Sequence, residues 1–145
     1  MDNRQSWCQY FSEIAEVVSK RSTCDRKHCG AVIVLEKMIL STGYNGSIRG
    51  GQHCDEVGHL MEDGHCVRTI HAEANALIQA ARNGVNVNGA KMYTNTFPCW
   101  GCFKLIANAG IVKVCYRDAY RVDPKVVTHA EQLGIILFEV PKEKL

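Results

Sequence analysis

Two short stretches of His, Glu and Cys constrain this chain more than any other feature. The first reads His-Ala-Glu from residue 71, and the second reads Pro-Cys-Trp-Gly-Cys from residue 98. Cys99 and Cys102 are three residues apart, so on a helix their thiols lie on one face. His71 and Glu73 are two apart, and they can converge with the thiols if both stretches begin helices. The fold is then expected to bring two helix N-termini together, where their positive ends favour thiolates.

One imidazole and two thiolates, from His71, Cys99 and Cys102, make three protein ligands for a zinc ion. A catalytic zinc keeps its fourth position for water, whereas a structural zinc fills all four with protein ligands. Zinc lowers the pKa of that water from about 16 to about 7. Glu73 is the natural proton shuttle, because it can take a proton from the water and pass it to a ring nitrogen and a leaving amine.

This order of residues resembles the established signature of zinc-dependent nucleobase deaminases. The alternative interpretation is a closed structural zinc site with a fourth protein ligand. The long separation between the two stretches, each opening a helix, is unlike a compact zinc finger.

The composition of the chain favours one domain and argues against some partners. Its 145 residues suit a single zinc-dependent domain, residues 1–145, and 46% of them are apolar. A net charge of +2 is not the strong basic bias of a protein whose main partner is a nucleic acid polymer. The longest apolar run, 31–35, is too short to span a membrane, and no apolar signal core follows a basic start. We therefore expect a cytoplasmic protein with no membrane partner.

Periodicity and turn residues predict an alternation of helices and strands after an initial helix and a β-hairpin. The helix that begins at His71 is expected to bury a stripe of Ala74, Leu77, Ile78 and Ala81. The polar segment 52–68 is expected to be a long loop. The whole predicts a three-layer α/β/α fold with a five-stranded mixed sheet whose last two strands are parallel. The expected helices are 7–20, 71–82, 99–109 and 124–134, and the expected strands are 30–35, 38–44, 92–94, 111–116 and 135–140.

Beyond the two metal stretches, several blocks of sequence carry a resemblance to a known family. They are Arg-Ser-Thr-Cys from residue 21, Cys-Gly-Ala-Val-Ile-Val from residue 29, Gly-Tyr-Asn-Gly-Ser from residue 43, His-Cys-Asp-Glu from residue 53 and His-Cys-Val-Arg-Thr-Ile from residue 65. With these blocks the chain resembles the deoxycytidylate (dCMP) deaminases of the cytidine deaminase superfamily over about residues 6 to 140. The resemblance implies conversion of dCMP and water to dUMP and ammonia, which supplies the dTMP precursor.

The resemblance also implies a homohexamer that dCTP activates and dTTP inhibits, each bound with Mg²⁺. By position in the family, Asn45 should contact the deoxyribose and the Ala72 backbone should contact the base. Candidates for the 5′-phosphate are Thr23, Arg26 and Tyr120. The expected effector site comprises Gly43, Tyr44, Asn45, Gly46, Arg49, Gln79 and Arg82.

Some members of the family carry a second, structural zinc, and this chain has matching residues. The expected ligands are Cys24, Cys54, His59 and His65, with His59 the least secure and Cys66 or His53 as competitors. The alternative is that these are unconnected loop residues. If zinc binds there, it would order the polar loop between Gly46 and His71.

Other substrates and another class of protein also fit parts of the pattern. The chain could deaminate free cytidine or deoxycytidine, a tRNA adenosine or single-stranded DNA, although polymer binders use basic grooves and stacking aromatics. A non-catalytic zinc module is a further alternative, against which Glu73 argues. Trp100 stands where relatives more usually have Pro or a small residue, and the sequence does not distinguish a pocket wall from a subunit contact.

Overall fold

The computed structural model describes residues 3–142 as an alternation of helices and strands around one main sheet. The helices are α1 (Trp7–Ser19), α2 (Cys54–Val57), α3 (Ala72–Arg82), α4 (Trp100–Asn108) and α5 (Pro124–Leu133). The main strands are β1 (Gly30–Leu35), β2 (Met38–Tyr44), β7 (Lys91–Thr96), β8 (Lys113–Asp118) and β9 (Ile136–Glu139), and the short ones are β3 (Gly46–Ser47), β4 (Met61–Glu62), β5 (His65–Cys66) and β6 (Thr69–Ile70).

The main sheet has five strands in the order β2-β1-β7-β8-β9. β1 pairs antiparallel with both β2 and β7, whereas β7, β8 and β9 run parallel to one another. Glu36 and Lys37 join β1 to β2 with positive φ angles of 51° and 65°, as a two-residue hairpin turn requires. The expected five-stranded mixed sheet and its parallel last strands are therefore confirmed.

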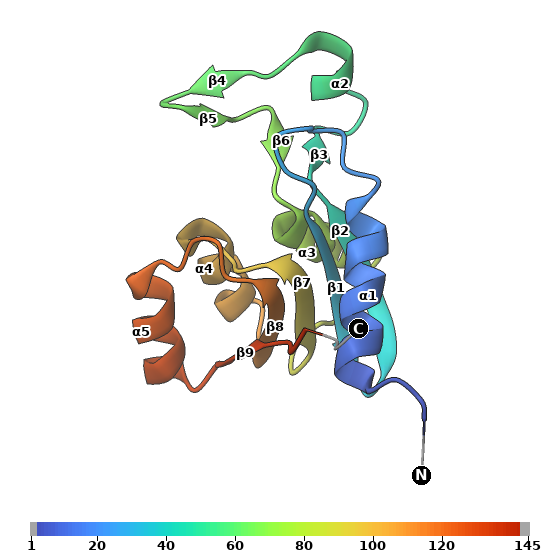
Figure 1. Ribbon diagram of the computed structural model, residues 1–145, viewed down its shortest axis with the longest axis vertical. Helices are drawn as coiled ribbons and strands as arrows, with labels where there is room; N and C mark the ends of the chain where they lie inside the picture. Colours follow the sequence, from blue (N-terminus) through green and yellow to red (C-terminus); the bar gives the residue numbers. More distant parts are fainter. Residues whose placement is uncertain (1–2, 143–145) are drawn as a thin grey trace.

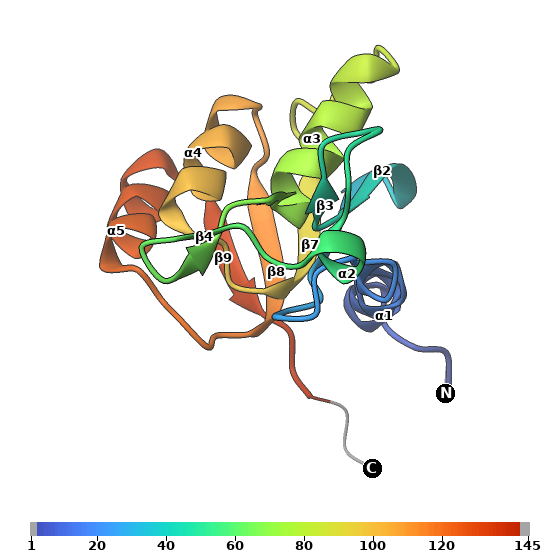
Figure 2. The same ribbon diagram turned by 90° about the horizontal axis from the view of Figure 1, so that it is seen from above.

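Helices cover both faces of the sheet, in the three layers expected from the sequence (Figures 1 and 2). Strand alternation separates the two cores: Val114 of β8 packs with α3 and α4, and its neighbour Cys115 packs with α1. α5 lies beside α4, where Phe103 and Val126 share a third apolar cluster. The parallel strands end on the same edge of the sheet, near the helix starts that carry the metal stretches.

The buried stripe of α3 differs from the expected one. Ile78 is 47% exposed and Ala81 is exposed, whereas the stripe that faces the sheet consists of Ala72, Ala76 and Ala80. The cause is close packing on β2, because a Cβ at Gly43 would lie 2.3 Å from the Ala76 nitrogen. Only small residues fit at such a contact. A prediction that places large apolar residues such as Ile78 on the buried face is therefore wrong for this helix.

The segment between β3 and α3 extends away from the sheet, at the top of Figure 1. It contains α2 and three two-residue strands, of which β4 and β5 form a small hairpin and β6 pairs with β3. The expectation of a long, mostly irregular loop over 52–68 is thus close to the structure. Within residues 3–142, no helix combines the length and the apolar character that crossing a membrane requires.

Candidate functional site

His71, Cys99 and Cys102 meet between the first turns of α3 and α4, and we call them the reaction cluster. His71 is the N-cap of α3 and Cys99 is the N-cap of α4. The Nδ1 atom of His71 lies 3.5 Å from the Cys99 Sγ and 3.3 Å from the Cys102 Sγ. Their ligand atoms all lie within 4.8 Å of one another, which suits a zinc ion bound by one imidazole and two thiolates.

The electrostatics of the reaction cluster favour a thiolate and a carboxyl group of raised pKa. The Cys102 thiol and the His71 imidazole hold the pKa of the Cys99 thiol well below its usual range. Glu73, in the first turn of α3, is only 5% exposed, and burial raises the pKa of its carboxyl group. A carboxyl group whose pKa moves toward neutrality can both accept and donate a proton, as a shuttle must.

A cavity of about 570 Å³ opens beside the reaction cluster, a volume typical of small-molecule sites. Its walls come from the segment before β1, the end of β7, the segment before α3 and the first turns of α3 and α4. Ala72 and Asn45, the residues expected at the base and the sugar, both line it. We call this space the reaction cavity; its lining residues are Cys24, Arg26, Lys27, Cys29, Asn45, His65, Cys66, Val67, Thr69, His71, Ala72, Glu73, Thr96, Phe97 and Cys99.

The three phosphate candidates lie in different surroundings. Arg26 lines the reaction cavity, and its guanidinium lies 3.5 Å from the Met61 Sδ. Thr23 is not a lining residue, and its hydroxyl lies 2.8 Å from the His53 Nδ1. Tyr120 is 65% exposed and is not a lining residue either, but its ring receives the Lys27 ammonium 4.4 Å from its centre. Lys27 also lines the reaction cavity, and the sequence analysis did not name it as a candidate although it directly follows Arg26.

The residues expected to bind effectors do not surround the reaction cavity. Of the seven, only Asn45 lines it. Gly43 packs on the first turns of α3, and the Tyr44 carbonyl accepts a hydrogen bond of 2.9 Å from Asn75. The exposed members of the set, Arg49, Gln79 and Arg82, lie on the turn after β3 and on the later turns of α3.

A second His/Cys group, which we call the loop cluster, lies in the extended segment and differs in one member from the expected set. Cys24, Cys54 and His59 come together as expected, but the fourth member is Cys66. The Cys54 and Cys66 sulfurs are 3.6 Å apart, as are the Cys24 Sγ and the His59 Nδ1. His65 is exposed and is not a member of the cluster, although both His65 and Cys66 line the reaction cavity. Neighbours in a strand such as β5 point to opposite sides, so only one of the two can face the other three members.

Asp25 supports the loop cluster from outside, a role that was not expected from the sequence. The Nε2 atom of His59 lies 2.7 Å from the Asp25 carboxylate, while the Nδ1 atom faces the cysteines. A carboxylate on the far nitrogen fixes the tautomer and the orientation of a metal-binding histidine. His53, the other competitor for the cluster, is held by Thr23. The pair of adjacent residues Cys24-Asp25 was the signal in the sequence that could have identified this role.

Trp100, whose role the sequence left open, packs between α4 and α5. Its ring lies 4.8 Å from the His129 ring and 6.2 Å from the Phe103 ring, centre to centre. It does not line the reaction cavity. Within this chain, Trp100 is therefore part of a helix–helix contact.

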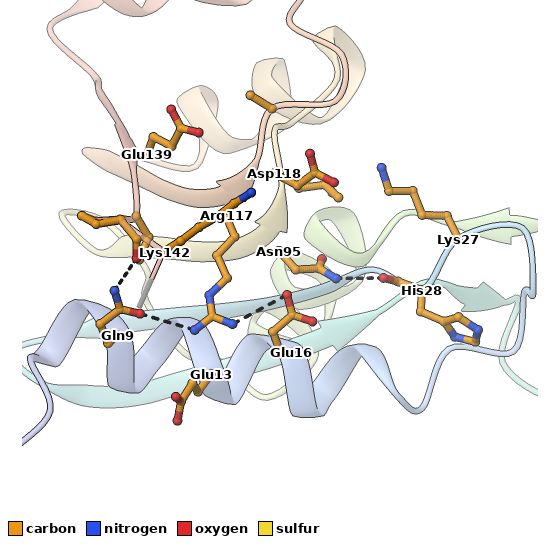
Figure 3. Close-up of a pocket in the computed structure, with 14 residues that line it drawn as sticks. Gln9, Glu13, Glu16, Lys27, His28, Asn95, Arg117, Asp118, Glu139 and Lys142 are labelled. Carbon is orange, nitrogen blue, oxygen red and sulfur yellow. Dashed lines mark hydrogen bonds and ion pairs between the residues drawn. The ribbon is translucent and has the colours of Figure 1, made fainter. Parts of the chain in front are cut away.

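A second cavity, of about 630 Å³, lies on the α1 side of the sheet and is shown in Figure 3. Its charges are mixed: Arg117 reaches Glu16 and Gln9 of α1, while Glu139 and Asp118 lie nearby. It shares only Lys27 and Thr96 with the reaction cavity. The reaction cluster opens into the other space, so the chemistry belongs to the reaction cavity.

Known proteins share both the sequence pattern and the fold of this chain. A family model described as "Cytidine and deoxycytidylate deaminase zinc-binding region" matches residues 5–118. The structure of the dCMP deaminase from the cyanophage S-TIM5, solved with dCMP and dUMP, superposes with a TM-score of 0.80 at 32% identity. The match covers 91% of this chain and 95% of the phage protein.

Two cellular relatives are similar over nearly the whole chain. The ComE operon protein 2 of Bacillus subtilis (strain 168) is 44% identical over 142 residues, 98% of this chain and 75% of the relative. The deoxycytidylate deaminase of Schizosaccharomyces pombe is 35% identical over 97% of this chain. The chain spans 46% of that yeast enzyme's length. With this match and the two-helix zinc motif, the chain belongs to the zinc-dependent cytidine and deoxycytidylate deaminase family.

Proposed function

We propose that this protein catalyses the hydrolytic deamination of dCMP to dUMP and ammonia. The observation that carries the proposal is the buried Glu73 carboxyl group beside the reaction cluster, in the lining of the reaction cavity. Two relatives whose names specify dCMP, the S-TIM5 and fission yeast enzymes, support the choice of substrate. The product is the precursor of dTMP.

Each residue of the site has a role in this proposal. A zinc ion held by His71, Cys99 and Cys102 supplies a water molecule of lowered pKa, about 7. Glu73 would take one proton from the attacking water and give it to the pyrimidine ring nitrogen as the water oxygen bonds to the carbon that carries the amine. A second proton from the same oxygen would then pass through Glu73 to the amine, so that the C–N bond breaks and ammonia leaves. The Ala72 backbone orients the base. Asn45 binds the deoxyribose with the amide N–H and the oxygen lone pair that its hydrogen bonds to Lys27 and Cys29 leave available.

The loop cluster serves a structural purpose in this proposal. Four ligand side chains, Cys24, Cys54, His59 and Cys66, would close a zinc site that leaves no position for water. Backbone N–H groups lower the pKa of Cys66 against the effect of its burial, whereas burial raises that of Cys54. Zinc there would join the segment before β1 to the segment before α3, and both segments line the reaction cavity.

The proposal extends to regulation, assembly and location. dCTP activates and dTTP inhibits, each with Mg²⁺, at a site that includes residues 43–46, Arg49, Gln79 and Arg82. The assembly is a homohexamer, for which the exposed Ile78 of α3 and Leu105 of α4 are available contacts. All eight cysteines lie in the described residues and none of them forms a disulfide, which fits a reducing compartment such as the cytoplasm.

Ammonia release from dCMP, deoxycytidine and a single-stranded oligodeoxynucleotide tests the substrate. We expect kcat/KM to be highest for dCMP and undetectable for the oligonucleotide. A higher value for deoxycytidine would assign the chain to nucleoside deamination, and no release from any of the three would favour a non-catalytic zinc module. Repeating the dCMP assay with dCTP–Mg²⁺ and dTTP–Mg²⁺, and measuring the molar mass by light scattering, tests regulation and assembly.

A further inference from the structure

The loop cluster places two thiols of unequal exposure next to each other. The Cys54 and Cys66 sulfurs are 3.6 Å apart. Cys54 is buried at the start of α2, whereas Cys66 of β5 is partly exposed and lines the reaction cavity. A small solute that enters this cavity can therefore reach Cys66, and Cys54 is the thiol in contact with it.

The third thiol of the loop cluster is less suited to react with such a solute. Cys24 also borders the reaction cavity, but it is only 3% exposed and its sulfur faces the His59 Nδ1 at 3.6 Å. It belongs to the segment before β1, whereas Cys54 and Cys66 are 12 residues apart in the extended segment. Exposure thus distinguishes Cys66 as the first thiol to react, and proximity distinguishes Cys54 as its partner.

The backbone around this pair offers little resistance to bringing the two sulfurs together. A disulfide requires them to approach by about 1.5 Å. Cys54 lies in a helix of four residues and Cys66 in a strand of two, and the segment that carries both extends away from the main sheet (Figure 1). By contrast, Cys99 and Cys102 belong to the start of α4, and Cys102 is part of the central core. A small displacement is therefore less restrained in the loop cluster.

We propose that Cys66 and Cys54 are a redox-active pair, which a peroxide oxidises to a disulfide with release of the loop-cluster zinc. The Cys66 thiolate attacks hydrogen peroxide, so that an S–O bond forms, the O–O bond breaks and hydroxide leaves. The Cys54 thiolate then attacks the Cys66 sulfur, so that the S–S bond forms, the S–O bond breaks and a second hydroxide leaves. The two sulfurs lose two electrons to the peroxide, and two protons from solvent convert both hydroxides to water.

The disulfide cannot replace zinc as a link between segments. Zinc in the loop cluster would also bind Cys24 and His59, and so would join the segment before β1 to the extended segment. The disulfide joins only two residues of the extended segment and leaves Cys24 unlinked to it. Because both segments line the reaction cavity, oxidation should loosen its wall and raise KM for dCMP several-fold. The inference rests on the proposed function, since it takes the loop cluster to hold zinc.

Oxidation of the zinc-loaded protein with hydrogen peroxide tests the proposal. A chromogenic chelator should record the release of about one of two zinc ions per chain. Peptide mapping by mass spectrometry should find one new disulfide, between Cys54 and Cys66, and dithiothreitol with added zinc should restore the thiols and the metal. A disulfide between Cys99 and Cys102, a disulfide that includes Cys24, or a sulfinic acid at Cys66 without any disulfide would overturn the proposal.

Two variants identify the partner thiol. In Cys54→Ser no thiol lies beside Cys66, so peroxide should leave a sulfenic acid on Cys66 that dimedone labels. If this variant fails to fold, the peptide map of the unmodified protein still decides the pairing. Cys8→Ser is the matched control, because Cys8 is also partly exposed but belongs to neither cluster. It should release zinc as the unmodified protein does, and a loss of that release would assign the reaction to Cys8 and reject the pair.

Zinc content and deamination keep this inference separate from the proposed function. If the protein deaminates dCMP but binds one zinc ion per chain, the zinc release is rejected and the proposed reaction is retained. If it releases no ammonia but loses one of its two zinc ions as the disulfide forms, the inference is retained and the reaction is rejected. In an active protein, a KM for dCMP that oxidation does not change would reject the effect on the cavity wall.

Discussion

The reaction cluster and the loop cluster use the same side chains on very different supports. The reaction cluster rests on the first turns of α3 and α4, which pack on the central sheet around Ala72, Cys102 and Ile106. The loop cluster joins residues of irregular backbone, α2 and a two-residue strand, outside that sheet. One arrangement offers three ligands and a carboxyl group, and the other offers four ligands and no carboxyl group among them.

The difference shows what each cluster can do. In the reaction cluster the fold positions the ligands, so a metal there can keep a position open for chemistry. In the loop cluster few apolar contacts hold the backbone, so the metal would itself hold the structure together. Placement on regular elements thus accompanies reactivity, and placement on loops accompanies a structural role.

The largest effect expected from this comparison is at Glu73. Glu73→Gln removes the proton shuttle but keeps a side chain of similar size, so kcat on dCMP should fall about 10²- to 10⁴-fold. Zinc content, measured by atomic absorption, should not change. Glu62→Gln, an exposed carboxylate in β4, is the control and should retain full activity. A Glu73→Gln enzyme that remains fully active would remove the distinction between the two clusters.

The loop cluster should respond through its metal content and stability. Cys66→Ala removes one of four ligands, so zinc should fall from about two to about one per chain. Hydrogen exchange over 50–70 should then accelerate, because the loop loses its cross-link. His65→Ala is the matched control, since it alters the adjacent residue outside the cluster. If His65→Ala loses the zinc and Cys66→Ala keeps it, the fourth ligand is His65 and not Cys66.

The smallest effect expected is at Asp25, which touches a ligand rather than the metal. Asp25→Asn should weaken zinc binding at the loop cluster about 10- to 100-fold, because His59 loses the carboxylate that orients it. Competition with a chromogenic chelator measures this change. Asp55→Asn, an exposed acid of α2, should leave the affinity unchanged. Equal affinities in both variants would mean that the Asp25 contact does not tune the site.

Much of the fold follows from the sequence because local signals and packing agree. Ser6 accepts a hydrogen bond from the Gln9 N–H at the start of α1, as its position predicts. Asp123 does the same for Lys125 before α5, and Gly134 ends that helix with a φ of 71°. The stripe of α3 could not be predicted in the same way, because close approach to Gly43 selects alanine over larger apolar residues.

The members of the reaction cluster could be predicted from the sequence, whereas the fourth member of the loop cluster could not, and the reason is physical. The spacing of Cys99 and Cys102 within one helical turn determines that their thiols share a side, so the reaction cluster could be identified from the motif. The choice between His65 and Cys66 depends on which way a two-residue strand turns. That direction is set by a hairpin with positive φ at Asp63 and Gly64, which hydrophobic periodicity does not reveal. The contact between Lys27 and Tyr120 joins distant segments and carries no local signal at all.

Asn45 and Asn95 each make two hydrogen bonds to the backbone of residues 27–30, and these bonds have a consequence for which substitutions the fold tolerates. Because these four hydrogen bonds end on the main chain of residues 27–30, replacing the side chains at 27, 28 or 29 leaves them intact. New substrate preferences can therefore arise by point substitution on an unaltered frame. We expect a library randomised at these positions to contain a high proportion of folded proteins. Residues 27–29 are therefore a suitable starting point for directed evolution.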